Sequence, residues 1–211
     1  MLHSDARFRP LYPSESVVRF LVAAHPKGIS HPPKLLDIGS GAGRHLLTAA
    51  EMGYSPVGLD FSHTGLLHAR ERLLAKGVAP FLSVAGMTCL PFADETFDAV
   101  LSYGVFYYAS AGEMKKSIGE VLRVLKLGAK AFVVLRTSRD YRYGKGTELE
   151  PGTFQLNITD TNELNTVQHF VTEKQIPEYF AGFSQIHFEK NEFTFSDRTK
   201  LNSDWLITAQ K

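Results

Sequence analysis

The chain has 211 residues, of which 44% are hydrophobic and 21% are charged, and its formal net charge is +1. This composition is typical of a globular protein with enough apolar residues for one α/β core, so we expect a single domain over residues 1–211. The small net charge excludes the broad positive field that attracts nucleic acid or an anionic membrane.

Cysteine usage and hydropathy indicate the compartment. The one cysteine, Cys89, cannot form an internal disulfide, and the opening stretch MLHSDARFRP lacks the apolar centre of a signal peptide. No apolar run approaches the roughly 20 residues that cross a bilayer. We therefore expect a cytoplasmic protein without a membrane partner. The sequence leaves its oligomeric state open, and a monomer is compatible with it.

The hydrophobic periodicity predicts alternating helices and strands. Helices are expected over 14–24, 44–52, 62–76, 113–125 and 173–180, and strands over 34–38, 56–60, 81–84, 97–102, 131–135, 185–195 and 204–209, with the last two strands forming a hairpin. Ser14 and Ser62 are the expected caps of the first and third helices, and Gly128 is the expected end of the fourth. The expected apolar faces include Val17, Val18, Leu21 and Val22 in the first helix, and Leu66, Leu67, Leu73 and Leu74 in the third.

Residues 136–172 lack this periodicity. A segment of that length is unusual for a plain loop, so we expect an insertion over the edge of the site that carries substrate specificity. The first helix is expected to cap the same site.

The most informative stretch is Leu35–His45, LLDIGSGAGRH. Leu35, Leu36 and Ile38 are typical of a buried strand, and Gly39, Gly41 and Gly43 follow before a helix begins near Arg44. Glycines let a ligand approach the backbone, and the first N–H groups of a helix are free to meet it. A tight bend without a ligand would use the same residues.

A carboxylate at the end of the next strand favours the ligand interpretation. Asp60 follows Gly41 by nineteen positions, and in a βαβ unit this places it where an acid accepts hydrogen bonds from a ribose diol. The alternative is a residue of an ordinary turn at the strand end. Phe61, directly after it, is predicted to lie against an adenine or to pack in the core.

The glycine spacing then distinguishes between two classes of nucleoside-binding site. It is G-x-G-x-G, and Arg44 occupies the third glycine position of the dinucleotide fingerprint. Farther along the chain come LPFADETFDAV (Leu90–Val100) and EVLRVLKLGAKAFV (Glu120–Val133). In this order the motifs resemble the class I S-adenosylmethionine-dependent methyltransferases. The resemblance covers about Lys34–Leu135. It implies a doubly wound, mostly parallel, Rossmann-like α/β sheet of seven strands in the order 3-2-1-4-5-7-6, with the last strand antiparallel.

The resemblance implies roles for individual residues. The cofactor would be S-adenosylmethionine, held by the bend from Asp37 to Gly43 with Asp37 near the methionine amine, by Asp60 and Phe61, and by the residues after the fourth strand; the cofactor-binding set is Asp37, Gly39, Ser40, Gly41, Gly43, Asp60, Phe61, Met87, Tyr103 and Gly104. Relatives usually carry a carboxylate for the adenine amino group where this chain has Gly86. Met87 could still offer its backbone N–H, and we expect weaker cofactor binding of about tenfold or more from the lost hydrogen bond.

The acceptor and the general base are less constrained. His169 and Tyr107 are the candidate catalytic residues, because histidine has the most suitable pKa and the tyrosine follows the fourth strand; the other candidates are Tyr12, Tyr108, Glu148 and Glu150. A packed histidine is the alternative for His169. The spacing of His63 and His68 fits no metal site, so we expect none. A faint similarity of Gly144–Phe154 to tellurite-resistance methyltransferases suggests a small-molecule acceptor.

Other interpretations stay open. The segment Arg136–Lys145 is rich in arginine and tyrosine and could contact RNA, but the net charge argues against a nucleic-acid partner, and a solvated lid over the substrate is the preferred interpretation. The predicted function is methyl transfer from S-adenosylmethionine to a small molecule. The alternatives are a non-catalytic binding module, an RNA or protein methyltransferase, and a dinucleotide-dependent oxidoreductase.

Overall fold

The computed structural model describes residues 10–28 and 30–211, so nearly all of the N-terminal stretch MLHSDARFRP lies outside the described residues. The helices are α1 (Glu15–Ala24), α2 (Arg44–Glu51), α3 (His63–Leu74), α4 (Ala111–Val124) and α5 (Ile176–Tyr179), with a 3-10 turn, η2 (Glu173–Gln175), before the last. The strands are β1 (Lys34–Ile38), β2 (Ser55–Asp60), β3 (Phe81–Val84), β4 (Phe97–Tyr103), β5 (Leu125–Arg136), β6 (Gly146–Glu150), β7 (Thr153–Leu156), β8 (Val167–His169), β9 (Gln185–Phe195) and β10 (Lys200–Gln210).

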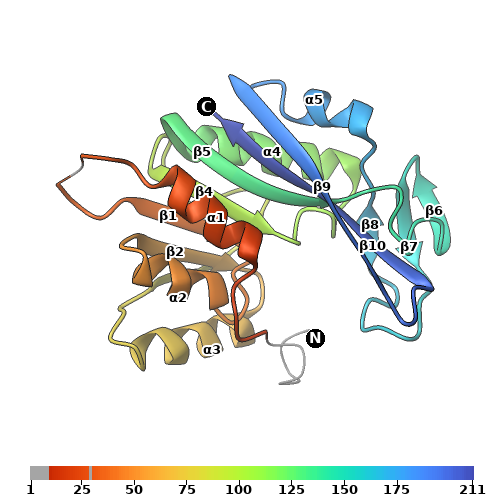
Figure 1. Cartoon of the computed structure of the whole chain (residues 1–211), viewed down its shortest axis with the longest axis horizontal. Helices are drawn as coiled ribbons and strands as arrows, with labels where there is room; N and C mark the ends of the chain where they lie inside the picture. The colour runs from red at the N-terminus through yellow and green to blue at the C-terminus, as the bar shows by residue number, and fades with distance from the viewer. Residues whose placement is uncertain (1–9, 29) are drawn as a thin grey trace.

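Seven of these strands form the main sheet, in the order β3-β2-β1-β4-β5-β10-β9 (Figure 1). Counted within this sheet, the order is 3-2-1-4-5-7-6, as the family resemblance implied. The first five strands in this order, from β3 to β5, pair with their neighbours in parallel, whereas β10 runs antiparallel to both β5 and β9. The predicted hairpin of the last two strands is confirmed.

Two apolar cores cover the two faces of this sheet, because successive residues of a strand point to opposite sides. Leu36 on β1 and Val100 on β4 join the core that includes Ile118 of α4. Leu35, directly before Leu36, joins the other core, in which Val17 of α1 is packed. The doubly wound architecture follows from strands that are apolar on both faces.

The predicted helix faces are partly wrong. In α1, Val22 is exposed and Phe20 is buried in its place; in α3, Leu67 and Leu74 are exposed, while Gly65 and Ala69 face the protein. Small residues take the inner positions of α3 because the glycine bend lies close to this helix: a Cβ on Gly43 would stand 2.9 Å from that of Ala69. The Ser62 cap is confirmed by its side chain, which accepts the N–H of Gly65 at 3.1 Å, whereas Ser14 caps α1 without a side-chain hydrogen bond.

Helix α4 and strand β5 meet at a different place from the one predicted. The helix begins after Ser110, which forms a capping box with Glu113, and it ends at Val124. Gly128 therefore does not end the helix but lies inside β5, with φ at 74°. Its N–H donates to the carbonyl of Lys211 at 3.0 Å. The contact with β10 extends the strand beyond the apolar run that sequence periodicity could detect.

The insertion has its own structure. Strands β6, β7 and β8 form a three-stranded antiparallel sheet with a small core of Phe154, Leu156, Ile158 and Phe170, located at one end of the molecule beside the β9–β10 hairpin (Figure 1). A bridge between Thr137 and Val171 and the indole N–H of Trp205, which donates to the carbonyl of Val171 at 2.8 Å, fasten this sheet to the main one. Within the described ranges, the helices are too short or too polar to span a membrane.

Candidate cofactor and acceptor site

The glycine bend follows β1 and is tied to the end of β2. The N–H groups of Gly39 and Ser40 both donate to the carbonyl of Leu59, at 2.7 and 3.0 Å. Gly39, Gly41 and Gly43 have φ values of 76°, 51° and 77°, which lie in the left-handed region that side chains disfavour. The bend thus uses glycine for conformation at all three motif positions.

A close contact with a neighbouring loop is a second reason for glycine at position 39, the first glycine of the motif. A Cβ on Gly39 would stand 2.1 Å from Cγ2 of Val105, in the loop after β4. The bend and the β4 loop are therefore in direct contact. The sequence-predicted cofactor residues after β1 and after β4 are brought together at the carboxyl edge of the sheet, where α/β proteins bind their ligands.

Asp60 ends β2 beside the bend, as predicted, and is 5% exposed. Its Oδ2 accepts the N–H of Gly41 and its Oδ1 accepts the N–H of Ser62, both at 2.8 Å. Each carboxylate oxygen has two lone pairs, so both retain one that a ribose hydroxyl could use. The carboxylate thereby holds the glycine bend in addition to its predicted role.

Asp37 lies at the base of the same bend and is buried. Its Oδ2 has no hydrogen-bond partner among the described residues, and neither has the hydroxyl of Ser40. Burial raises the pKa of Asp37 to about 7, opposed by the positive charge of Arg44 and assisted by Asp60. An unpaired buried carboxylate is costly, and a ligand ammonium would relieve that cost.

The adenine side of the predicted site is open. Phe61 is 79% exposed, so the alternative of core packing is wrong for this residue. Met87 is partly buried against the core that includes α4. A Cβ on Gly86 would meet nothing within 4 Å, which leaves room there for a side chain that this chain does not have.

On the acceptor side, Tyr103 is the last residue of β4, one residue beyond the predicted end of the strand, and Gly104 follows it. Tyr103 packs edge-on against His45 with ring centroids 5.3 Å apart, and Gly104 has φ at 76°. The phenol oxygen of Tyr107 lies 3.0 Å from the point where a Cβ of Gly104 would stand. Tyr107 is thus adjacent to the predicted cofactor residues.

His169 is buried and hydrogen-bonded, unlike a general base whose ring nitrogen is free to meet a substrate. It is 0% exposed on β8, and both ring nitrogens have partners: Nδ1 meets the hydroxyl of Thr153 at 2.7 Å and Nε2 meets that of Tyr179 at 2.8 Å. Burial lowers its pKa, opposed by Glu150. Its backbone N–H donates to the carbonyl of Tyr107 at 2.8 Å, so the histidine helps to hold the backbone of Tyr107 in place.

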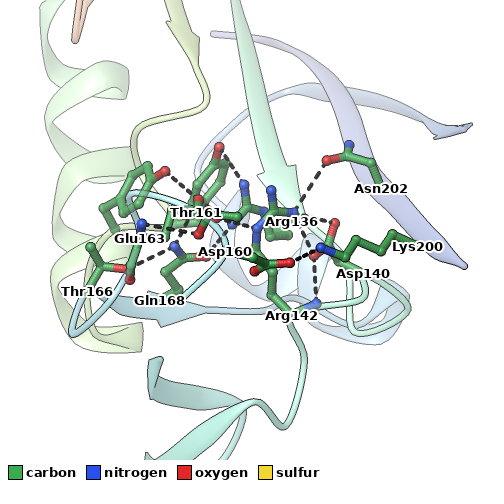
Figure 2. A network of polar contacts seen from close by, with 12 residues as sticks. Arg136, Asp140, Arg142, Asp160, Thr161, Glu163, Thr166, Gln168, Lys200 and Asn202 are labelled. Carbon is green, nitrogen blue, oxygen red and sulfur yellow. Dashed lines mark hydrogen bonds and ion pairs between the residues drawn. The ribbon is translucent and has the colours of Figure 1, made fainter. Parts of the chain in front are cut away.

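A polar network that the sequence did not reveal lies at the end of β5 (Figure 2). Glu163 accepts from Arg136 at 3.2 Å, from the Tyr108 hydroxyl at 2.7 Å, and from Arg142. Burial by itself would raise the pKa of Glu163, but the two guanidiniums hold it at about 2. The expectation of a solvated lid over Arg136–Lys145 is therefore wrong for these arginines, which are bound to buried carboxylates.

Sequence patterns did not indicate the burial of two titratable side chains, His45 and Glu163, and the reasons differ. His45 lies in the first turn of α2, where its Nε2 accepts the N–H of Ser14 at 3.4 Å, and burial followed by the charge of Arg44 lowers its pKa to about 3. Its place next to the glycine motif could have suggested a structural role. Glu163 has no such local signal, because its partner Arg136 precedes it by 27 residues.

Comparisons with known proteins agree with this arrangement. A family model described as a methyltransferase domain matches residues 35–128. An uncharacterized protein of Mycobacterium tuberculosis is 30% identical over 188 residues, covering 77% of this chain and 67% of that protein. The demethylmenaquinone methyltransferase of Renibacterium salmoninarum is 38% identical over 101 residues, covering 47% of this chain and 40% of that protein.

The fold comparison extends over nearly the whole chain. A solved S-adenosylmethionine-dependent methyltransferase from Methanosarcina mazei superposes with a TM-score of 0.71 at 24% identity, covering 86% of this chain and 94% of that one. Among curated relatives, the chain spans about half the length of the first matches, at 52% and 40%. The chain belongs to the class I S-adenosylmethionine-dependent methyltransferases, and S-adenosylmethionine is the cofactor of this family.

The residues present fit this cofactor. The unpaired carboxylate oxygen of Asp37 suits an α-ammonium group, the free lone pairs of Asp60 suit a ribose diol, and the exposed ring of Phe61 suits an adenine. These three side chains come from the ends of β1 and β2, in the order in which the three parts of the cofactor occur.

Proposed function

We propose that this chain catalyses methyl transfer from S-adenosylmethionine to a small-molecule acceptor held at the carboxyl ends of β4 and β5. The observation that carries this proposal is the buried Oδ2 of Asp37, which has no hydrogen-bond partner among the described residues, beside the bend held by Asp60. The cofactor supplies a methyl group on a sulfonium, so the bonding electron pair returns to sulfur when an acceptor lone pair takes the methyl.

The contribution of the protein is placement rather than covalent chemistry. Holding the two reacting groups about 3 Å apart in line supplies several kcal/mol of the barrier. Tyr107, next to Gly104, is the proposed contact to the acceptor. His169 is proposed as a support of that residue, because its ring nitrogens are engaged with Thr153 and Tyr179.

A small acceptor is supported by the surroundings of the site. Arg136 and Arg142 are engaged with Glu163, and Arg139 donates to Glu192 at 3.0 Å, so these arginines offer little charge to a nucleic-acid backbone. One relative is named a demethylmenaquinone methyltransferase, and one structural neighbour was solved with 1,6-didemethyltoxoflavin bound. Both names denote small acceptors.

The test combines binding and transfer. Calorimetric titration with S-adenosylmethionine, S-adenosylhomocysteine and NAD should give saturable binding of the two sulfur ligands only. A fractionated cell extract incubated with methyl-labelled cofactor should then yield a labelled small molecule, identified by mass. Binding of NAD alone would establish an oxidoreductase, and tight binding without labelling of any fraction would establish a non-catalytic binding module.

A further inference from the structure

Within residues 10–28 and 30–211, the hydroxyl of Tyr107 is a hydrogen-bond donor without an acceptor. The residue is 8% exposed, and its oxygen accepts Nη2 of Arg136 at 3.1 Å. Among the described residues no atom accepts the phenolic proton itself. Tyr108, its neighbour, differs in this respect, because its hydroxyl donates to Glu163 at 2.7 Å. A buried donor left without a partner is unfavourable, so this proton is suited to a ligand oxygen.

Arg136 fixes both the position and the polarity of this phenol. Its guanidinium carbon lies 4.2 Å from the centroid of the Tyr107 ring, and the side chain is held in turn by Glu163 and Gln168. A permanent cation stacked on the ring and bonded to its oxygen withdraws charge from the hydroxyl, and so strengthens its donation. Arg136 touches no reacting atom in this arrangement and acts as a positioning residue.

The polar cluster around Tyr107 contains several charged side chains, and its net charge limits which ligands it can recognise. Arg136 and Arg142 face Glu163 and Asp140, so two positive groups are balanced by two negative ones. Asp204 also lies near this cluster, and burial, the largest influence, raises its pKa. A balanced cluster does not favour phosphate or another polyanion, and the Tyr107 hydroxyl is a polarised neutral donor within it.

The surroundings of the hydroxyl are aromatic. The ring centroids of Tyr107 and Tyr108 lie 4.8 Å apart, and Tyr103 at the end of β4 forms a second ring pair with His45 of α2. Aromatic side chains of this kind pack favourably on planar rings. The site therefore combines aromatic rings with the polarised hydroxyl of Tyr107.

We propose, on the basis of the function proposed above, that the Tyr107 hydroxyl held by Arg136 binds an anionic oxygen of a planar acceptor, which assigns the acceptor to phenols or enols bound in their deprotonated form. Such an acceptor loses its proton to water before it binds. The reaction then needs no protein base, which agrees with the engagement of both nitrogens of His169 and of both oxygens of Glu163.

The test uses 4-nitrophenol as the probe, with nitrobenzene as the matched ligand that lacks the oxygen. Both are titrated into the complex with S-adenosylhomocysteine, and the phenolate absorbance reports the protonation of the bound probe. We expect the protein to bind 4-nitrophenol about ten- to hundredfold more tightly than nitrobenzene, and to lower the pH at which the bound probe ionises.

Three variants distinguish the contribution of the Tyr107 hydroxyl to probe binding from that of the neighbouring groups. Tyr107→Phe should remove the preference for 4-nitrophenol, and Arg136→Lys should reduce it and raise the pH at which the bound probe ionises. Tyr108→Phe removes a hydroxyl from the same cluster and should keep the preference within about threefold. Affinity for S-adenosylhomocysteine should be unchanged in all three variants, which checks that they are folded.

Each contrary result is decisive. Equal affinity for the two probes in the wild-type protein, no binding of 4-nitrophenol, or a preference that survives Tyr107→Phe would overturn the inference while leaving methyl transfer intact. If Tyr107→Phe does not fold, the ionisation of the probe on the wild-type protein decides alone, because an unshifted titration also overturns it. Failure to bind S-adenosylhomocysteine would instead overturn the proposed function.

Discussion

Replacing Asp37 by asparagine should change how the stability of the protein depends on pH. An unfolded chain releases this proton near pH 3.8, whereas burial raises the pKa of Asp37 to about 7 in the folded protein. Between these pH values only the folded state holds the proton, so raising the pH destabilises the fold. With the pKa of Asp37 moving from 3.8 to about 7, the loss across this window is about 4 kcal/mol.

Urea denaturation at several pH values between about 4 and 8 measures this effect. The free energy of unfolding of the wild-type protein should fall relative to that of Asp37→Asn as the pH rises through this range, and the two should run parallel above it. Parallel curves throughout would refute the reasoning, because they would mean that the buried carboxyl ionises as it does in water.

The same carboxyl should make cofactor binding depend on pH. If the carboxylate of Asp37 pairs with the ligand ammonium, the affinity for S-adenosylhomocysteine should rise by up to tenfold per pH unit from about pH 5 to 7. 5′-Methylthioadenosine keeps the nucleoside and the thioether but lacks the amino-acid group. Its affinity should stay constant over this range, as should that of either ligand for Asp37→Asn. An equal rise for both ligands would place the titrating group elsewhere.

Three further substitutions test the remaining parts of the site. Asp60→Ala should weaken binding of S-adenosylhomocysteine at least tenfold in calorimetry, since it removes the proposed ribose acceptor and the bonds that hold the bend; unchanged affinity would refute the proposed role. Gly39→Ala should destabilise the protein by about 1–3 kcal/mol and weaken the same ligand, because its φ is 76° and its Cβ would meet Val105. Gly86→Ala, where a Cβ meets nothing within 4 Å, is the control and should leave both quantities unchanged. His169→Ala should lower the free energy of unfolding in urea by about 2–4 kcal/mol, since it removes a fully buried ring together with its hydrogen bonds to the hydroxyls of Thr153 and Tyr179. Its affinity for S-adenosylhomocysteine should stay at the wild-type value; a loss there with unchanged stability would contradict a supporting role.

Local patterns explain why the glycine bend and the place of Asp60 beside it could be predicted from the sequence. Strand β1, the glycines and Asp60 lie within 27 consecutive residues, and their conformations depend on one another. The hydrogen bonds from Gly39 and Ser40 to Leu59 are those of a βαβ unit, for which the spacing is diagnostic.

The acceptor side depends on contacts that the sequence separates widely. Arg136 reaches Glu163 across 27 positions, and Asp140 accepts the N–H of Ser203 across 63. Strands β6, β7 and β8 are short, and the insertion lacked the periodicity by which strands are recognised. For the same reason the burial of His169 could not be predicted, because it requires Thr153 and Tyr179 from other elements.

On the proposed function, the attachment of the insertion at Thr137, Val171 and Trp205 would affect how acceptors are selected. A segment joined to the main sheet at both of its ends has little freedom to rearrange around an incoming molecule. Recognition then loses little conformational entropy and favours acceptors whose shape already matches. Related chains would change their acceptor through the identity of side chains on a constant framework, without a hinge that would let one enzyme adapt to many molecules.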